Sequence, residues 1–268
     1  MKTLYVTDLD GTLLRRNQTI SDFTAGTINQ LVDEGLLFSY ATARSIVTAR
    51  KVTPNLTTKF PVIVHNGTFI RRPDNGEILV GHYLGNEATK IIDDLVRYGI
   101  YPIVYSLLDG QEKFSYWPEK LTPGMARFIG TRRNDPRDRI VRSADDLYAG
   151  EPYYITCVDE KEKLLPFYSK YAQDLHAILY EEIYSGDEFL EFMPKQASKA
   201  NAALELKALL GCDRLVAFGD GLNDLDLFRV ADEAYAVENA VPELKAVATG
   251  IIGSNENDGV ANWLLQNA

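Results

Sequence analysis

The feature that most constrains the fold is an alternation of short apolar runs with helical patterns near both ends of the chain. The strand-like runs in these two parts are residues 4–7, 36–42, 61–67, 214–220, 234–239 and 250–253. The helical patterns between and after them are residues 21–34, 44–52, 198–211, 223–231, 241–249 and 258–266. This alternation favours right-handed βαβ units and a parallel sheet.

The middle of the chain has a different pattern. Extended runs flank PDNG (73–76) and, further on, DG (109–110), and both turn sequences are typical of β-hairpins. A helical pattern over 86–99 lies between the two hairpins. We therefore expect an α/β fold with a doubly wound, Rossmann-like parallel sheet formed by 1–84 and 191–268. A separate α+β domain at 85–190 is inserted into it.

Composition narrows the classes of function. The 268 residues carry a formal net charge of −10, which argues against a nucleic-acid or anionic-membrane surface, because such surfaces need clustered lysine and arginine. No apolar run approaches the roughly 18 residues of a membrane span, and acidic residues interrupt the first apolar run, unlike a signal peptide. We expect a cytoplasmic protein whose cysteines, Cys157 and Cys212, are reduced.

Two acidic motifs follow predicted strands. Asp8 and Asp10 stand in DLDGT, and Asp220 and Asp224 stand in GDGLND. Ligands of open α/β sheets bind at the carboxyl ends of the strands, so we expect these carboxylates to converge there. Because like charges raise the cost of ionising one another, such a cluster needs a cation, and Mg²⁺ suits a site of carboxylate and carbonyl oxygens. The sequence therefore predicts Mg²⁺ as the cofactor.

The DLDGT motif also carries groups suited to phosphoryl transfer. The Asp8 carboxylate can attack phosphorus, and Asp10 can protonate the leaving oxygen and then activate water. Gly11 lets the chain approach the phosphoryl oxygens closely. A lone DxD would more simply be an exposed turn, but its pairing with GDGLND favours the chemical interpretation.

Two further residues fit that chemistry. Thr42, at the end of the second strand, can donate its hydroxyl to a phosphoryl oxygen, although alone it would be an ordinary strand residue. Lys199, at the start of a helix, can neutralise phosphoryl charge. A lysine in the first helical turn is usually solvated and is disfavoured by the helix dipole, so a buried anionic partner would explain its position.

Together these residues resemble the haloacid dehalogenase-like phosphohydrolase superfamily, and within it the Cof-type hydrolases with a large inserted cap. The matching motifs are DLDGT, Thr42 in YATARS, Lys199 in ASKANAAL, GDGLND with its Asn223, and the C-terminal VENAVPELKAVAT and NDGVANWL. The resemblance covers the whole chain. It implies that the insertion is a cap that determines substrate specificity.

The resemblance also implies a set of site residues. Mg²⁺ would be held by Asp8, the backbone carbonyl of Asp10 and Asp220, with Asp224 in support. Apart from what the resemblance implies, the predicted substrate-binding residues are Gly11, Arg44, Asn66, Gly67 and Asn223. A surface arginine at Arg44 and a simple turn at Asn66-Gly67 are equally good interpretations of those positions. Family members usually have glycine after the motif threonine, whereas this chain has Ala43, a change expected to alter the loop near Arg44.

The predicted function is that of a Mg²⁺-dependent phosphatase acting on small phosphorylated metabolites, first of all sugar phosphates, as a monomer or homodimer. A phosphomutase or phosphotransferase would use the same residues, with a second hydroxyl in place of water. A phospho-accepting signalling module, such as a response-regulator receiver, shares the aspartates, threonine and lysine. Receivers lack an acid two residues after the nucleophile, so Asp10 favours the hydrolase.

Overall fold

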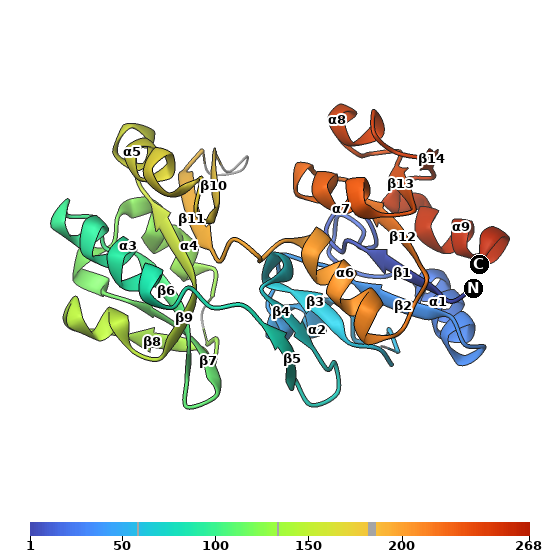
Figure 1. Ribbon diagram of the computed structural model, residues 1–268, viewed down its shortest axis with the longest axis horizontal. Coiled ribbons are helices and arrows are strands. Elements are labelled where there is room, and N and C mark those ends of the chain that lie inside the picture. Colours follow the sequence, from blue (N-terminus) through green and yellow to red (C-terminus); the bar gives the residue numbers. More distant parts are fainter. Residues whose placement is uncertain (58, 133, 182–185) are drawn as a thin grey trace. The chain divides into compact units, whose positions relative to one another are not determined.

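The computed structural model describes residues 1–57, 59–132, 134–181 and 186–268, and they form two compact units (Figure 1). One unit consists of Met1–Gly81 with Gln196–Ala268, and the other of His82–Lys195. The second unit is thus an insertion in the sequence of the first, with limits slightly wider than the 85–190 expected from the sequence. None of the described helices is both long and apolar enough to cross a membrane.

The first unit is built on a parallel sheet with the strand order β14-β13-β12-β1-β2. The strands are β1 (Thr3–Thr7), β2 (Leu37–Tyr40), β12 (Arg214–Gly219), β13 (Glu233–Val237) and β14 (Gly250–Ile252). Leu4 of β1 pairs with Leu37 on one side and Leu215 on the other. Leu4 and Leu215 have no exposed surface. Such burial is expected of a central strand covered on both faces.

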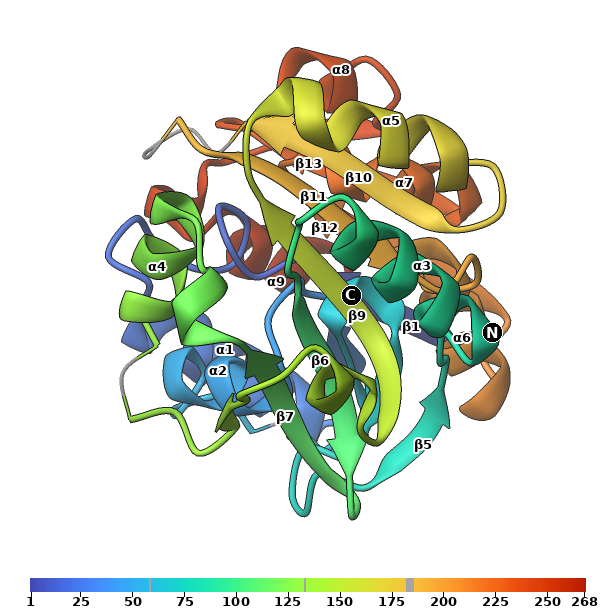
Figure 2. The same ribbon diagram turned by 90° about the vertical axis from the view of Figure 1, so that its left-hand side faces the viewer.

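Helices cover both faces of this sheet. They are α1 (Asp22–Asp33), α2 (Ile46–Val52), α6 (Lys199–Leu209), α7 (Leu225–Val230), α8 (Pro242–Lys245) and α9 (Gly259–Asn267). Helices α1 and α9 pack side by side, and α6 and α7 lie side by side on the opposite face (Figures 1 and 2). The α6 helix begins after Ser198, whose hydroxyl accepts a hydrogen bond from the Asn201 backbone N–H (3.1 Å).

Two local predictions differ from the structure. The helix expected over 241–249 is limited to α8, because the chain then leads into β14. Just before this strand, the Thr249 N–H bonds to the Ala234 carbonyl (2.7 Å). The third predicted strand, β3 (Val62–Val64), pairs mainly with β4 (Phe69–Arg71), which pairs with β5 (Ile78–Gly81) in an antiparallel sheet. Its link to the parallel sheet is the bridge between Ala41 and Ile63.

The order in which the chain adds strands to the parallel sheet changes direction at the centre of the sheet. From β1 the chain proceeds outward to β2 on one side, and β12, β13 and β14 follow in order on the other. The switch point therefore lies between β1 and β12. Asp8 directly follows β1, and Asp220 directly follows β12. In open α/β sheets this crevice is where ligands bind.

The second unit contains a six-stranded sheet with the order β10-β11-β9-β6-β7-β8. Its strands are β6 (Ile103–Leu108), β7 (Gln111–Tyr116), β8 (Asp138–Ile140), β9 (Glu151–Val158), β10 (His176–Glu181) and β11 (Glu188–Met193). The hairpin predicted at DG (109–110) joins β6 and β7, and both turn residues have positive φ, 50° and 76°. Such angles are what an Asp-Gly hairpin turn requires.

Helices lie against both faces of this second sheet (Figure 2). Leu190 and Phe192 of β11 join an apolar cluster with side chains of α3 (Asn86–Arg97) and α5 (Lys161–Tyr171). Phe189 points to the other face and meets Phe128 of α4 (Pro123–Gly130), with ring centroids 5.4 Å apart. Among the described residues, short 3₁₀ segments occur at Pro118–Lys120, Asp145–Tyr148, Leu222–Asp224 and Asn255–Asn257, and the one-turn segment His65–Gly67 has left-handed backbone angles.

Candidate active site

Three aspartates meet at the switch point of the parallel sheet. Asp8 continues the ladder of β1, since its N–H bonds to the Phe218 carbonyl of β12 (2.9 Å). Asp220 follows β12, and Asp224 ends the short turn after it with no exposed surface. One ligand atom from each of the three carboxylates can be chosen so that all lie within 4.8 Å of one another.

Lys199 provides the positive charge at this cluster. Its Nζ lies 2.5 Å from Oδ1 of Asp8 and 2.7 Å from Oδ1 of Asp224, and the residue is only 2% exposed. The unfavourable position of a lysine at a helix N-terminus is thus offset by two buried carboxylates. Because α6 begins at Lys199, the Ser198 cap also fixes where the side chain starts.

The second oxygen of Asp224 organises the turn after β12. Oδ2 accepts hydrogen bonds from the backbone N–H groups of Asp220 and Gly221, both at 3.0 Å. Oδ1 is bound to Lys199, so both oxygens of Asp224 have partners. Asp224 therefore positions Asp220 and Lys199 within the cluster.

Burial and the repulsion between neighbouring carboxylates raise the pKa values of Asp8 and Asp220. Burial raises the pKa of Asp8, and the charges of Asp224 and Asp220 act in the same direction, while Lys199 opposes them. The pKa of Asp220 is raised to about 6, first by burial and then by Asp224, against a hydrogen bond from Thr12. Burial alone would lower the pKa of Lys199, but Asp224 and Asp8 outweigh it and the pKa is raised. The cluster thus carries more negative charge than one lysine balances.

This donor set fits Mg²⁺. The three aspartates offer hard oxygen atoms at mutual distances that one ion can span, and the excess negative charge favours a divalent cation. Asp10 was also predicted to bind the metal, but its carboxylate is not a member of this cluster. The resemblance to the family assigned only its backbone carbonyl to the metal.

The Asp10 side chain has a different partner. Arg44 binds both of its oxygens, with Nε at 2.7 Å from Oδ2 and Nη2 at 2.6 Å from Oδ1, and Nη2 also donates to Gln18 (3.1 Å). The carboxylate remains 49% exposed. Arg44, predicted as a contact of the substrate, is therefore seen as an ion-pair partner of Asp10, whose carboxylate it orients.

Close packing explains the glycine and threonine of DLDGT. Gly11 has φ +81°, and a Cβ there would lie 2.2 Å from Oδ2 of Asp220. The hydroxyl of Thr12 donates to Oδ1 of Asp220 (2.9 Å). Thr12 was not among the predicted site residues, although its place after the motif glycine brings it to the same carboxylate.

A left-handed turn lies beside the end of β2. His65, Asn66 and Gly67 have φ of 51°, 52° and 96°, and the Asn66 N–H bonds to the carbonyl of the buried Thr42 (2.9 Å). A Cβ on Gly67 would lie 2.1 Å from the Ser198 carbonyl, so only glycine lets the turn pack against the start of α6. Gly67 thus lies against the segment that carries Lys199, and Asn66 links this turn to Thr42.

Asn223 differs from the other residues of GDGLND. It is exposed in the turn that ends at the buried Asp224. The structure therefore leaves Asn223 accessible to solvent, whereas Asp224 is enclosed by its partners.

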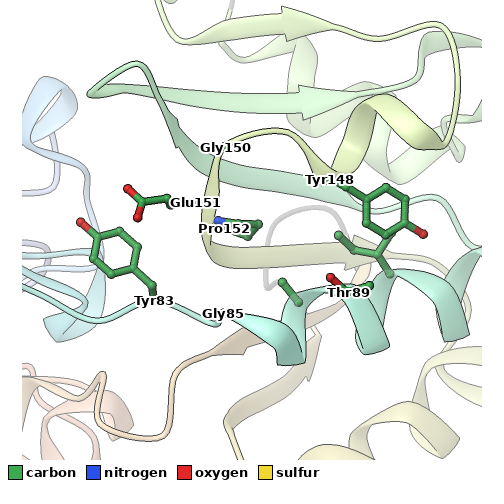
Figure 3. A pocket seen from close by; sticks show the side chains of 9 residues that line it. Tyr83, Gly85, Thr89, Tyr148, Gly150, Glu151 and Pro152 are labelled. Carbon is green, nitrogen blue, oxygen red and sulfur yellow. The ribbon is translucent and has the colours of Figure 1, made fainter.

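The second unit contains a cavity of a different character (Figure 3). It measures about 250 Å³ and is lined by Tyr83, Thr89, Tyr148, Glu151 and five smaller or apolar residues. The hydroxyl of Tyr148 donates to Asp93 (2.6 Å). With a single carboxylate in its lining, this cavity lacks an acidic cluster like the one at the switch point.

Comparisons with known proteins show what the whole chain is similar to. The family model for haloacid dehalogenase-like hydrolases matches residues 5–264. A 5-amino-6-(5-phospho-D-ribitylamino)uracil phosphatase of Bacillus subtilis, YitU, is 26% identical over 98% of this chain and 96% of its own length. A second B. subtilis phosphatase named for the same substrate, YwtE, is 29% identical over 97% of this chain and 96% of its own length.

Solved structures show the same fold. A crystal structure of a Thermotoga maritima protein has a TM-score of 0.81 and 22% identity, covering 100% of this chain and 98% of that one. A haloacid dehalogenase-like hydrolase from B. subtilis has a TM-score of 0.78 and 22% identity, with both chains covered completely. The fold of the whole chain is thus one that solved structures already show.

Proposed function

Because the chain belongs to the haloacid dehalogenase-like hydrolase family, we propose that it is a Mg²⁺-dependent phosphatase that works through an aspartyl-phosphate on Asp8. The observation that carries the proposal is the buried contact of Lys199 with Asp8 and Asp224, next to Asp220 at the switch point. The names of the relatives, which are phosphatases, support the reaction class.

In the first half of the proposed reaction, a carboxylate oxygen of Asp8 attacks the phosphorus of a phosphate monoester. A bond forms between Asp8 and phosphorus, and the bond from phosphorus to the ester oxygen breaks. Asp10 gives a proton to the departing oxygen, which leaves as an alcohol. Lys199, already 2.5 Å from Asp8, neutralises phosphoryl charge during the transfer.

In the second half, Asp10 takes a proton from a water molecule that attacks the phosphorus. The acyl-phosphate bond breaks, inorganic phosphate leaves and the Asp8 carboxylate is restored. Arg44 keeps the Asp10 carboxylate oriented through its two hydrogen bonds. The Thr42 hydroxyl, at the adjacent strand end, is assigned to a phosphoryl oxygen.

The metal would be held by Asp8 and Asp220, with Asp224 in support and the backbone carbonyl of Asp10 as a further ligand. Bound there, Mg²⁺ supplies positive charge that stabilises the phosphoryl oxygens. Thr12 and Gly11 assist on the protein side, because the first donates to Asp220 and the second leaves room for its carboxylate.

The proposed substrates are small phosphorylated metabolites, first of all sugar phosphates. The two B. subtilis relatives are named for a substrate with a phosphorylated ribityl chain, so phosphorylated open-chain polyols belong in the same screen. The acidic net charge of −10 disfavours large polyanionic substrates such as nucleic acid.

The test is release of inorganic phosphate from a panel of sugar, polyol, nucleotide and aryl phosphates, with and without Mg²⁺. We expect release that requires Mg²⁺ and is abolished in Asp8→Asn. Isomerised sugar phosphate without free phosphate would instead indicate a mutase. Stable phosphorylation without turnover would indicate a phospho-accepting module.

A further inference from the structure

The two strands beyond β12, β13 and β14, also place polar side chains near the carboxyl edge of the parallel sheet. Asn239 follows β13, and Asn255 follows β14. Both side chains are amides, which can donate and accept at once. They form no part of the acidic cluster at the neighbouring strands.

These amides form a continuous hydrogen-bonded path to the segment after DLD. Asn239 Nδ2 donates to the Gly11 carbonyl (2.7 Å), and its Oδ1 accepts from the Asn255 N–H (3.1 Å). Asn255 Nδ2 in turn donates to the Leu14 carbonyl (2.8 Å), and Asn255 is only 6% exposed. The path therefore ties two carbonyls of the motif loop to the C-terminal part of the chain.

The loop that it holds is the one that starts at Asp10. The N–H groups of Thr12, Leu13 and Leu14 all bond to the Leu9 carbonyl, at 3.3, 3.1 and 2.8 Å, so the chain turns sharply just after Asp10. Gly11 lies within this turn at φ +81° and has no side chain to resist rotation of its peptide. The bond from Asn239 supplies that restraint.

We propose that Asn239 is a positioning residue for Asp10, the group that protonates the leaving oxygen. This inference rests on the proposed function, because it assigns a purpose within that reaction. By fixing the Gly11 carbonyl, Asn239 fixes the backbone from which the Asp10 carboxylate projects. Asn255 holds Asn239 in place and secures the other end of the loop at Leu14.

The proposal has a consequence that simple loss of structure does not share. Departure of an alkoxide requires a proton from Asp10, whereas p-nitrophenolate leaves readily without one. The value of kcat/KM covers the steps up to departure of this group, so it isolates proton donation from the later attack of water. Misplacing Asp10 should therefore affect alkyl phosphates far more than p-nitrophenyl phosphate.

The experiment measures kcat/KM for p-nitrophenyl phosphate and for the best alkyl phosphate of the panel, in wild type, Asn239→Ala and Asn239→Asp. The aspartate variant keeps an oxygen for the Asn255 N–H but loses the donor to Gly11. We expect both variants to lose about ten-fold or more on the alkyl ester and less than about three-fold on the aryl ester.

The matched control is Asn29→Ala, which removes an amide of the same kind outside the motif loop: its Nδ2 donates to the Asn55 carbonyl (2.9 Å) and its Oδ1 accepts from the Thr57 N–H (2.6 Å). It should leave both kcat/KM values unchanged. Equal losses on both esters in the Asn239 variants, or no loss on either, would overturn the inference while leaving the phosphatase proposal intact. A wild-type enzyme that hydrolyses neither ester would refute the phosphatase proposal itself, and the inference with it.

Discussion

Replacing Lys199 with methionine would remove the ammonium group that binds both Asp8 and Asp224 while keeping an unbranched side chain of similar length. All three residues are at most 5% exposed, so the two carboxylates would remain buried without their cation. Removing one partner of a buried ion pair costs about 3–5 kcal/mol. We expect the free energy of unfolding to fall by about that amount at about pH 8 without Mg²⁺.

The loss should depend on pH with a definite sign. Burial already raises the pKa of Asp8 in the folded protein, and Lys199 is the group that opposes this rise. Without Lys199, the folded state would bind more protons than the unfolded chain between the ordinary carboxyl pKa and the raised value. The stability of the variant should therefore fall as pH rises through that window, and the defect should be smaller at about pH 5.5 than at about pH 8.

Urea denaturation of wild type and variant at both pH values measures this difference. The matched control is Lys207→Met on the same helix, because Lys207 meets Asp232 at 3.3 Å with side-chain exposures of 22% and 46%. Such partly exposed pairs contribute about 0–1 kcal/mol. A loss below about 1 kcal/mol for Lys199→Met at about pH 8, or a larger loss at about pH 5.5, would refute this reasoning.

Two further predictions concern the turn beside α6 and the metal. Gly67→Ala should reduce the free energy of unfolding by more than about 2 kcal/mol, since the new Cβ would meet the Ser198 carbonyl. The control is Gly26→Ala in α1, where a Cβ meets open space, and it should raise the free energy of unfolding by about 0.5–1 kcal/mol. Similar denaturation midpoints for the two variants would contradict the packing argument. Because Mg²⁺ needs an ionised Asp220, whose pKa is raised to about 6, calorimetry should show affinity weakening up to about ten-fold per pH unit below about pH 6. Affinity that stays constant between about pH 7.5 and pH 5 would speak against Asp220 as a ligand.

Much of the fold could be predicted because its signals are local. Alternating strand and helix patterns indicated the doubly wound sheet, and Asp109 with Gly110 indicated the β6–β7 hairpin that the structure contains. The pairing of β3 with β4 was not predicted, because the sequence of a short apolar strand does not indicate which other strand it will pair with. The length of α8 depends on where Thr249 joins the sheet, which is also a tertiary contact.

Part of the site could also be predicted from the sequence. Ligands of open α/β sheets bind at the carboxyl ends of the strands, so Asp8 and Asp220 were expected to lie together. A lysine in a first helical turn suggested the buried partners that Lys199 has. The pairing of Arg44 with Asp10 depends on the reach of a long side chain across a loop, for which the sequence has no periodic signal. Asn239 could have been found by looking for amide as well as carboxylate side chains just after the strands.

The central claim is that Asp8 becomes phosphorylated and that Asp10 is needed to complete turnover. The most direct test is to mix Asp10→Asn with its best substrate and Mg²⁺, quench in acid and analyse the peptides by mass spectrometry. We predict that the peptide containing Asp8 gains the mass of one phosphoryl group, and that Asp8→Asn/Asp10→Asn shows no such gain. An unmodified Asp8 peptide in a variant that releases alcohol, or phosphate attached to another residue, would contradict the account.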